Sequence, residues 1–466
     1  MACAIGAPNL FYLHTGGRLF HASRVVDVVR QAGVAWRWNW RALADLSALE
    51  HCVDGETLHA DVRRLRSGEV VRFDRNALQS WQVPWNERVA CSNASPEGAM
   101  AALADACRDY TATEVVVSMS AGFDSRLLLA CLLAFGNKPR LVTMGHRGST
   151  DARVSEAIAR RFGLSLSLVP LAEEDYPNIG GAVARITGGA KTFQNWHTYL
   201  YARNANLSSS STLFIGSNGE AARTYYLDKG IAALAADRFS SGQARHAFWR
   251  VKSRTIFQED EIASLHPNFA RELGGSGALS RAQRLEALSG GSLLRGLDEF
   301  YTDQRVTNFI ANGLSLVRAH AVPAAPMMDR AWSAQVWNLP RRWKLDSRWH
   351  RFAIARACPE LLEFEEETTG TRMRSSPSRF YWLPLRRRRR SAPYMDYARL
   401  LRSETMTQWI RERRDGIAPL ARPELLALVM KRHATGANRV RAASFLLTML
   451  SLLECLREEG IEIAAD

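Results

Sequence analysis

The segment from Val115 to Gly136, VVVSMSAGFDSRLLLACLLAFG, constrains the fold of this 466-residue chain more than any other stretch. Three consecutive β-branched residues, Val115 to Val117, predict a buried strand. A loop of small and polar residues follows, and the apolar run behind it predicts a helix that ends at Gly136. Such a loop at a helix N-terminus offers free backbone N–H groups and the positive end of the helix dipole to an anion. The segment therefore predicts an anion-binding loop within an α/β fold.

This loop also carries a carboxylate, Asp124. A carboxylate next to a bound phosphate is repelled unless a cation lies between them, so Asp124 predicts Mg²⁺ together with a phosphate ester. The chain has no GxxxxGK[ST] motif, and the expected ATP site is therefore not a Walker loop. Taken alone, the motif also fits an ordinary Gly/Ser loop before a helix.

Strands and helices alternate after this loop. A second strand is expected over residues 140–145, a helix over 151–162 and a third strand over 165–169, and a short strand over 213–215 comes later. This alternation predicts a parallel sheet with helices on its faces. Ligands of such sheets bind at the carboxyl ends of the strands, which is where the Asp124 loop and the loop after residue 215 would lie.

The hexapeptide from Ser120 to Ser125, SAGFDS, resembles the SGGxDS pyrophosphate loop of ATP pyrophosphatases, with Ala121 in place of the first glycine. Arg126 and the stretch LVTMGHRGSTDARVSEAIARRFGL resemble the asparagine synthetase branch of that superfamily. The resemblance implies ATP and Mg²⁺ as cofactors. The residues implied to contact ATP or pyrophosphate lie at predicted strand ends: Ser118, Ser120, Ala121, Gly122, Phe123, Asp124, Ser125, Thr143, Gly145, Gly216 and Ser217.

A second loop, Gly216-Ser217-Asn218-Gly219-Glu220, stands where asparagine synthetases have an SGEGADE-like loop whose Asp binds the metal on the pyrophosphate. Aligned without a gap, Glu220 falls at that Asp. The resemblance therefore implies Asp124 and Glu220 as metal ligands, and Mg²⁺ usually takes one or two carboxylates plus phosphate oxygens and water. The alternative is that Glu220 only stabilises a helix N-terminus.

A third stretch, Leu314 to Leu362, resembles the family segment with a Pro-x-x-Asp turn and a "WKL" element, and departs from it twice. Asparagine synthetases have Glu and Arg before the turn, whereas this chain has Val322 and Ala324, so aspartate is not the expected substrate. The family's catalytic lysine falls at Arg348, and Arg351 lies one helical turn later. Arginine can stabilise an oxyanion as a fixed cation but cannot share a proton. Arg348 and Arg351 are the predicted catalytic residues.

The N-terminal region resembles part of a glutaminase domain, through FYLHTGGRLFHASRVVDVVRQAG and GETLHADVRRLRSGEVVRFDR. Residues 1–92 are too few for the whole glutaminase fold. Cys3 follows Ala2, so removal of Met1 would not expose it as a nucleophile, and Cys3 is interpreted as an ordinary small residue. Without glutaminase chemistry, the amine must come from ammonia, another small amine or the substrate itself.

The predicted fold class is α/β: a parallel-sheet synthetase domain of the ATP-pyrophosphatase type follows a truncated α+β domain that is glutaminase-like, or N-terminal-nucleophile-like. The expected divisions are residues 1–92 for the truncated, inactive domain, 93–365 for the ATP-binding domain, 366–392 for a charged irregular segment and 393–466 for a helical extension. The last helix of this extension is expected to be amphipathic and to pack against the protein.

The chain has a net charge of +14 and contains an unbroken basic run from Arg386 to Arg390, which Arg372, Arg374 and Arg379 precede. The run is interpreted as a solvated loop, or as a surface for an acidic peptide, a membrane or nucleic acid. No RNA-binding module is recognisable, so nucleic acid is not the expected partner. The sequence has no signal-peptide pattern, and its seven scattered cysteines predict reduced thiols and a cytoplasmic location.

The truncated glutaminase region, the substituted aspartate site and the GFDSR loop together resemble the macrolactam synthetases, or lasso peptide cyclases, of bacterial peptide-natural-product clusters. The resemblance implies a ligase that adenylates an Asp or Glu side chain of a core peptide and joins it to the peptide's N-terminal amine. The implied partners are a precursor peptide, a leader peptidase and a membrane-associated export complex. The alternatives are an intermolecular amide ligase acting on a small molecule or sugar acid, an RNA-base-modifying ATP pyrophosphatase, and an inactive nucleotide-binding partner.

Overall fold

The computed structural model describes most of the chain, in ten stretches: residues 9–74, 77–110, 114–208, 210–226, 242–289, 293–367, 370, 372–373, 392–432 and 437–464. Cys3, Arg374, Arg379 and the Arg386–Arg390 run lie outside the described residues, so the interpretations made for them stay predictions.

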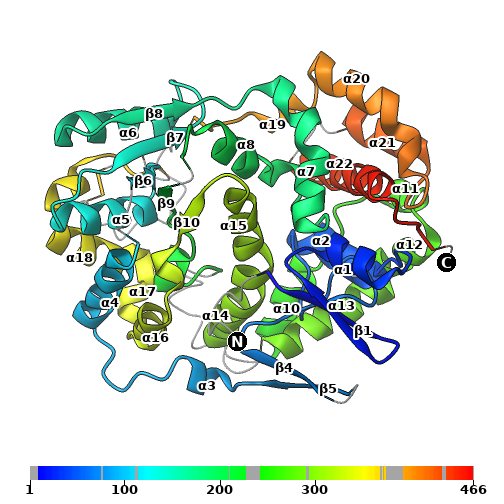
Figure 1. The fold of residues 1–466 in the computed structure, drawn as a ribbon, viewed down its shortest axis with the longest axis horizontal. Coiled ribbons are helices and arrows are strands. Elements are labelled where there is room, and N and C mark those ends of the chain that lie inside the picture. The colour runs from blue at the N-terminus through cyan, green and yellow to red at the C-terminus, as the bar shows by residue number, and fades with distance from the viewer. Residues whose placement is uncertain are drawn as a thin grey trace.

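A five-stranded parallel sheet lies on one side of the molecule (Figure 1). The loop Ser120–Ser125, which the sequence predicts to bind phosphate (the phosphate loop), follows one of its strands. The strands of the sheet, in the order in which they pair, are β10 (Val322–Ala324), β9 (Ser211–Phe214), β6 (Glu114–Ser118), β7 (Arg140–Met144) and β8 (Leu166–Val169). The chain runs from β6 outward to β7 and β8, and then returns to β9 on the other side of β6. This reversal places a topological switch point beside β6, where open α/β sheets bind ligands. The α/β class and the parallel sheet predicted from the sequence are confirmed.

Helices cover both faces of this sheet, because successive side chains of a strand point to opposite faces. Val117 joins a large apolar cluster, and its neighbour Val116 joins a smaller one. Residues of the large cluster come from α4 (Pro96–Arg108), α5 (Phe123–Ala134), α6 (Thr150–Phe162), α16 (Arg330–Asn338) and α18 (Arg348–Ala357). Residues of the smaller cluster come from α8 (His197–Asn204) and α15 (Ala311–Arg318).

The helix boundaries near the predicted site follow local sequence signals. Ser95 caps α4 by accepting a hydrogen bond from the Gly98 N–H at 2.9 Å, with Pro96 as the first helical residue. The chain leaves α5 through Gly136, whose φ of +79° is in the left-handed region. Gly163 ends α6 in the same conformation. The predicted end of α5 at Gly136 and the helix expected over residues 151–162 are confirmed.

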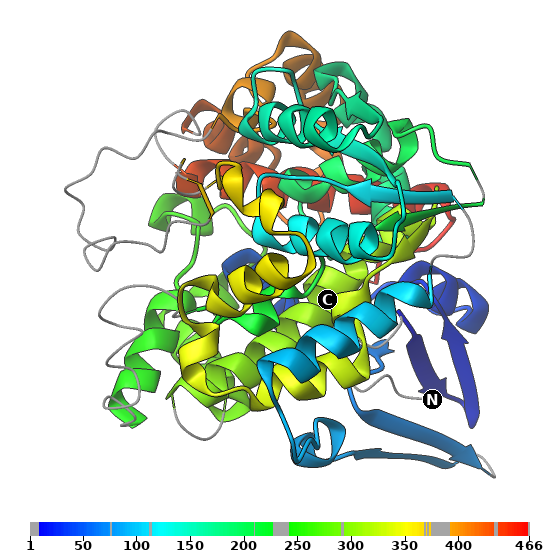
Figure 2. The ribbon, with the colours of Figure 1, turned by 90° about the vertical axis from the view of Figure 1, so that its left-hand side faces the viewer.

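The N-terminal region is antiparallel and contains most of the remaining strands. One sheet has the order β2 (Arg18–Ala22), β1 (Phe11–Thr15), β3 (Arg63–Arg64), and β4 (Glu69–Asp74) pairs with β5 (Ala77–Gln82) as a separate hairpin. Figures 1 and 2 both place this hairpin at the lower edge of the molecule. The helices of this region are α1 (Val25–Ala32), α2 (Trp40–Leu49) and α3 (Trp85–Arg88). This region thus contains both strands and helices, and its glutaminase-like assignment and the domain boundaries stay predictions.

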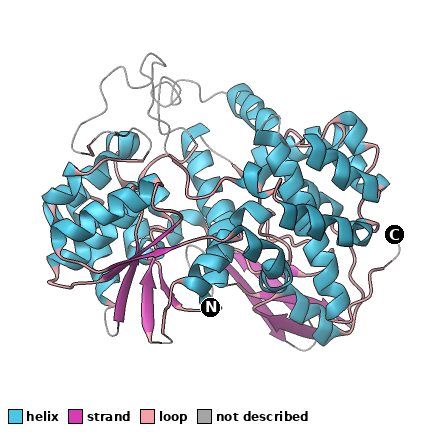
Figure 3. Ribbon diagram, turned by 90° about the horizontal axis from the view of Figure 1, so that it is seen from above, coloured by secondary structure: helices cyan, strands magenta, loops and turns pink. Residues whose placement is uncertain are grey.

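Further helices fill the space between and around the two groups of strands, which Figure 3 shows from above. Those that follow the parallel-sheet strands are α7 (Tyr176–Thr187), α10 (Gly242–Lys252), α11 (Glu259–Ile262), α12 (Pro267–Leu273), α13 (Gly275–Leu288), α14 (Leu293–Phe300), the π-helix η4 (Tyr301–Ile310) and α17 (Arg341–Lys344). Short 3₁₀ turns connect several of them: η1 (Glu173–Asp175), η2 (Phe193–Asn195), η3 (Gly219–Ala222), η5 (Pro326–Met328), η6 (Leu345–Ser347), η7 (Pro359–Glu363) and η8 (Arg414–Ile417).

The C-terminal region is helical, as predicted, with α19 (Tyr397–Leu400), α20 (Glu404–Arg413), α21 (Pro423–Arg432) and α22 (Ala437–Glu458). The prediction that the last helix is amphipathic is wrong, because every side chain from Ala442 to Leu453 is buried. α22 packs against α7, α21 and α2, and its residues share one apolar core with residues of the N-terminal region. No helix within the described ranges is both long enough and apolar enough to cross a membrane.

The burial of α22 leads to a stability prediction. Leu447, which is 0% exposed, should cost about 2–5 kcal/mol of the free energy of unfolding when replaced by alanine, because a cavity forms in the core. Leu279→Ala is the control, since Leu279 is 44% exposed and should change stability by less than about 0.5 kcal/mol. Urea denaturation of both variants provides the comparison, and equal effects would contradict the assignment of α22 to the core.

Candidate functional site

Two loops meet at the carboxyl edge of the parallel sheet, on either side of the switch point. One follows β6 and contains Asp124 in the first turn of α5, and the other follows β9 and contains Gly216 and Gly219. A Cβ atom at Gly216 would lie 2.7 Å from Asp124 Cβ, and a Cβ at Gly219 would overlap the Asp124 carboxyl group. The glycines of the second loop thus allow its backbone to lie directly on the aspartate.

The two carboxylates predicted to bind the metal are brought together around one cation, the guanidinium of Arg223. Arg223 Nη2 lies 3.4 Å from Asp124 Oδ2 and 3.8 Å from Glu220 Oε1. Tyr301 donates a hydrogen bond to Glu220 Oε2 at 3.1 Å. Sequence reasoning missed Arg223 and Tyr301, because the contact of Arg223 with both carboxylates depends on the second loop, and the contact of Tyr301 with Glu220 depends on the π-helix η4.

These surroundings shift the two carboxyl groups in opposite directions. Burial raises the pKa of Glu220, and the neighbouring charge of Asp124 raises it further. Burial also acts to raise the pKa of Asp124, but attraction by Arg223 and His350 outweighs it and holds that pKa below its ordinary value. Asp124 is therefore the more strongly ionised member of the pair, and a cation between the carboxylates would favour ionisation of both.

His350 is a site residue that the sequence analysis did not single out, although it lies between the predicted residues Arg348 and Arg351. It is fully buried, and its Nε2 lies 2.8 Å from Asp124 Oδ1. The contact is close but not aligned as a hydrogen bond, and neither ring nitrogen of His350 has an aligned partner. The signal that could have found it is a histidine in the helix already expected to face the phosphate loop.

The two predicted catalytic arginines occupy different surroundings. The Arg351 guanidinium lies 5.0 Å from the ring centroid of Phe123 in the phosphate loop, so α18 reaches the site through it. Arg351 also donates hydrogen bonds to the carbonyls of Met373 and Asp346, at 2.9 Å for Met373. Arg348 is exposed at the first position of α18. Whether either side chain takes part in catalysis stays a prediction.

The turn before α18 is held in an unfavourable backbone conformation. Asp346 and Ser347 both have a φ of +53°, in the left-handed region that residues with a Cβ atom rarely adopt. Arg351 binds the carbonyl of Asp346 from within the helix. Backbone strain of this kind concentrates at functional sites, and here it lies in the turn that leads into α18, the helix that carries His350.

The phosphate loop is folded around its own hydroxyl groups. Ser120 Oγ lies 3.0 Å from Ser125 Oγ and accepts a hydrogen bond from the Gly122 N–H at 3.2 Å. The Ala121 N–H donates to Asp151 Oδ1 at 2.8 Å. Asp151, at the start of α6, was not predicted as a site residue, and burial raises its pKa. Its carboxylate therefore accepts a hydrogen bond from the Ala121 N–H, in a residue that the resemblance implies to contact ATP or pyrophosphate.

Among the remaining predicted contacts, Thr143 and Gly145 lie at the end of β7. Thr143 is buried and donates to the Met119 carbonyl at 2.6 Å, so it supports the phosphate loop from the sheet side. Gly145 has a φ of +111°, and a Cβ there would lie 2.8 Å from Tyr394 Cβ. The segment that precedes α19 therefore covers Gly145. Ser118 and Ser217 are partly buried at the two strand ends.

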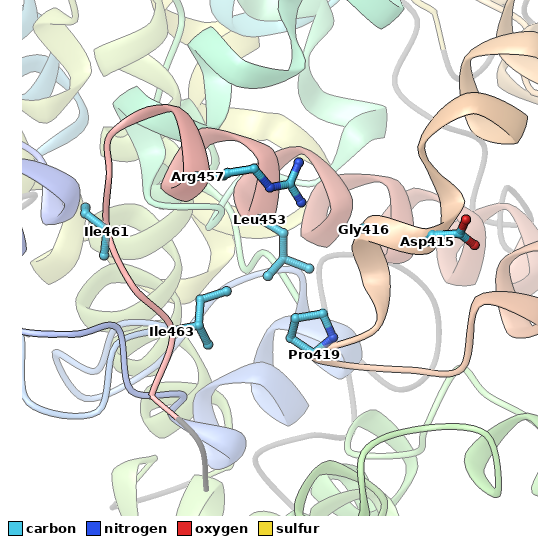
Figure 4. A pocket seen from close by; sticks show the side chains of 7 residues that line it. All are labelled: Asp415, Gly416, Pro419, Leu453, Arg457, Ile461 and Ile463. Atoms are coloured by element: carbon cyan, nitrogen blue, oxygen red, sulfur yellow. The ribbon is translucent and has the colours of Figure 1, made fainter.

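The described residues contain no group of three or more His, Cys, Asp or Glu side chains arranged to hold a metal ion. A metal at this site would therefore be held by the Asp124–Glu220 pair and completed by phosphate oxygens and water. A separate cavity of about 270 Å³ lies among the C-terminal helices (Figure 4). It is lined by Asp415, Gly416, Pro419, Leu453, Arg457, Ile461 and Ile463, none of which is a predicted site residue.

Comparison with known proteins adds no assignment: no protein-family model matches the chain, and no curated protein matches it.

The contact between the two loops yields a prediction about Gly219. Gly219→Ala should lower the free energy of unfolding by about 1–3 kcal/mol, because the added methyl group overlaps the Asp124 carboxyl group. Gly275→Ala is the matched control, since a Cβ at Gly275 meets nothing within 4 Å. Thermal and urea denaturation of both variants would test this, and a Gly219→Ala protein as stable as the control would contradict the close packing of the loops.

Proposed function

We propose that the protein is an ATP-dependent carbon–nitrogen ligase that forms AMP and diphosphate. The observation that carries the proposal is the pairing of Asp124 with Glu220 around the Arg223 guanidinium, at the switch point of a parallel sheet. A helix N-terminus, a loop of hydroxyl groups and a carboxylate pair occur together at this one place. Each has a separate task in binding a nucleotide with its divalent cation.

The residues at this place fit Mg²⁺ and a triphosphate. Asp124 Oδ1 is buried and accepts no aligned hydrogen bond, although His350 Nε2 lies 2.8 Å from it. Arg223 already occupies the space between the two carboxylates with positive charge, which is what a metal ion would supply more strongly. When bound, Mg²⁺ would neutralise charge on the phosphate oxygens. The loop amides and the hydroxyls of Ser120 and Ser125 would then exchange their internal hydrogen bonds for phosphate.

The proposed reaction activates a carboxylate, which is otherwise a poor electrophile because its leaving group would be oxide. A carboxylate oxygen attacks the α-phosphorus of ATP, the bond to the bridging oxygen breaks, and diphosphate leaves. An amine nitrogen then attacks the acyl carbon of the adenylate, AMP leaves with the C–O bonding electrons, and the nitrogen loses a proton. Holding both partners in one site can contribute up to about 7–11 kcal/mol in favourable cases. Arg351, beside Phe123, would act as a fixed cation for developing oxyanion charge.

Within this class we propose macrolactam closure, in which the acid is an Asp or Glu side chain of a core peptide and the amine is that peptide's own N-terminus. The support comes from the sequence: the truncated glutaminase-like region, and Val322 and Ala324 at the positions where asparagine synthetases bind aspartate. A precursor peptide and a leader peptidase would then be partners.

The proposal predicts the behaviour of Asp124→Asn. In this variant diphosphate release from ATP and Mg²⁺ should fall by about 100-fold or more, because a charged ligand is lost where charge develops. The substrate is the leader-free peptide encoded beside the protein's gene, and its product should be one water lighter by mass spectrometry. Asp105→Asn is the control, since Asp105 is 72% exposed on α4.

Normal turnover by Asp124→Asn would contradict the metal role of this residue. Diphosphate release by the wild type only with a small acid, or only with RNA, would contradict macrolactam closure. ATP binding without release under any of these conditions would contradict the ligase proposal.

A further inference from the structure

Two cationic side chains contact one aromatic ring on the π-helix η4. Lys191 Nζ lies 3.2 Å from the ring centroid of Phe309, and Arg305 Cζ lies 4.3 Å from the same centroid. Phe309 and Arg305 both belong to η4, and π-helical turns are frequent at functional sites. Lys191 is only 4% exposed.

Among the described residues, no carboxylate forms an ion pair with Lys191, and no oxygen accepts a hydrogen bond from its Nζ, which lies over the Phe309 ring. Burial, and then the charge of Arg305, hold the pKa of Lys191 well below its ordinary value, and the charge of Glu50 opposes this shift without forming an ion pair. Burial makes the charged form of Lys191 costly, and a carboxylate in contact with Lys191 and Arg305 would offset that cost and restore the charge.

The backbone beside Lys191 leaves room for its charged end. A Cβ atom at Gly313 of α15 would lie 3.2 Å from Lys191 Cε and 3.3 Å from Lys191 Nζ. These distances are tighter than ordinary contacts, so a side chain at position 313 would press on the ammonium group. α15 lies between the sheet and the C-terminal helices (Figure 1), where it contacts both β10 and α7.

A row of aromatic rings joins this cation pair to the candidate metal carboxylates. Arg305 Cζ lies 5.1 Å from the ring centroid of Tyr225. Tyr225 stacks on Tyr301 with 4.5 Å between ring centroids, and the Tyr301 hydroxyl donates to Glu220. These contacts therefore form a continuous row from the proposed reaction centre to the Lys191 amine. Its members, in order, are Tyr301, Tyr225, Arg305, Phe309 and Lys191.

We propose that Lys191 and Arg305 form a carboxylate-binding subsite, which holds a second carboxylate of the acid substrate while the first is adenylated. The rings of Tyr225 and Phe309 would pack against the carbon chain between the two groups. That the bound carboxylate belongs to the acid substrate rests on the proposed function, whereas carboxylate binding by Lys191 and Arg305 does not. The source of the second carboxylate is either a dicarboxylic acid or the C-terminus of a peptide.

The first test measures binding without ATP, so that it does not depend on ligase activity. Glutarate should raise the melting temperature of the wild-type protein and bind in isothermal titration calorimetry. Lys191→Met should lose about tenfold or more of this affinity, because a charged hydrogen-bond donor is removed. Arg305→Met should show a similar loss. Lys252→Met is the matched control, since Lys252 is an exposed lysine over the ring of Tyr226 and should leave glutarate binding unchanged.

A measurement of thermal stability accompanies the binding test. Without glutarate, Lys191→Met should melt at or above the wild-type temperature, because methionine replaces a buried amine whose charged form is costly there. Unchanged glutarate affinity in Lys191→Met, or a wild type that binds no glutarate and no peptide acid, would overturn the proposal. If glutarate binds through Lys191 while diphosphate release is never detected, the subsite stands and the ligase proposal fails.

The second test separates the two sources of the carboxylate. Acetyl-tetraalanine with a free C-terminus is compared with the same peptide as its C-terminal amide, again by calorimetry. Binding of the acid alone, lost in Lys191→Met, assigns the subsite to a peptide C-terminus. Binding of glutarate with neither peptide assigns it to a small dicarboxylic acid. Equal binding of acid and amide would contradict recognition of a carboxylate.

Discussion

The candidate site depends on one electrostatic arrangement, in which the Arg223 guanidinium lies between the carboxylates of Asp124 and Glu220. Two carboxylates this close repel each other unless a cation separates them. The arrangement requires the loop after β9 to lie on the first turn of α5, and Gly216 and Gly219 make that approach sterically possible. The strand order supports it, because β6 and β9 are neighbouring parallel strands and the loops that follow them leave the same edge of the sheet. Sheet topology, glycine placement and charge thus converge on one location.

Much of the parallel half of the fold could be predicted from the sequence because its signals are local. The valine run of β6, the Gly163 cap of α6 and the Ser95 cap of α4 each lie within a few residues of the element they define. The last helix shows where local reasoning fails. Ser444 and Ser451 give the sequence of α22 an amphipathic pattern, but both are buried in a core built from distant segments. Only tertiary contacts determine that burial.

The same distinction applies to the site. Asp124 was predicted as a metal ligand because it is a carboxylate in a loop expected to bind phosphate, and Glu220 because the resemblance places it at a metal-binding Asp. His350 and Arg223 could not, because their roles follow from the positions of α18 and η3 relative to α5. Arg348 was selected by alignment position and is exposed, whereas the buried His350, two residues later, contacts Asp124. The Lys191 cluster had no sequence signal, since a lysine before a helix usually lies at the surface.

The most direct test of the central claim is binding of a paramagnetic cation in the presence of a nucleotide that cannot release diphosphate. Mn²⁺ would be titrated with α,β-methylene-ATP and followed by electron paramagnetic resonance, in the wild type and in Asp124→Asn and Glu220→Gln. The account predicts one nucleotide-dependent Mn²⁺ site in the wild type, weakened by about tenfold or more in each variant. Equal Mn²⁺ affinity in all three proteins would contradict the claim that these two carboxylates form a nucleotide–metal site.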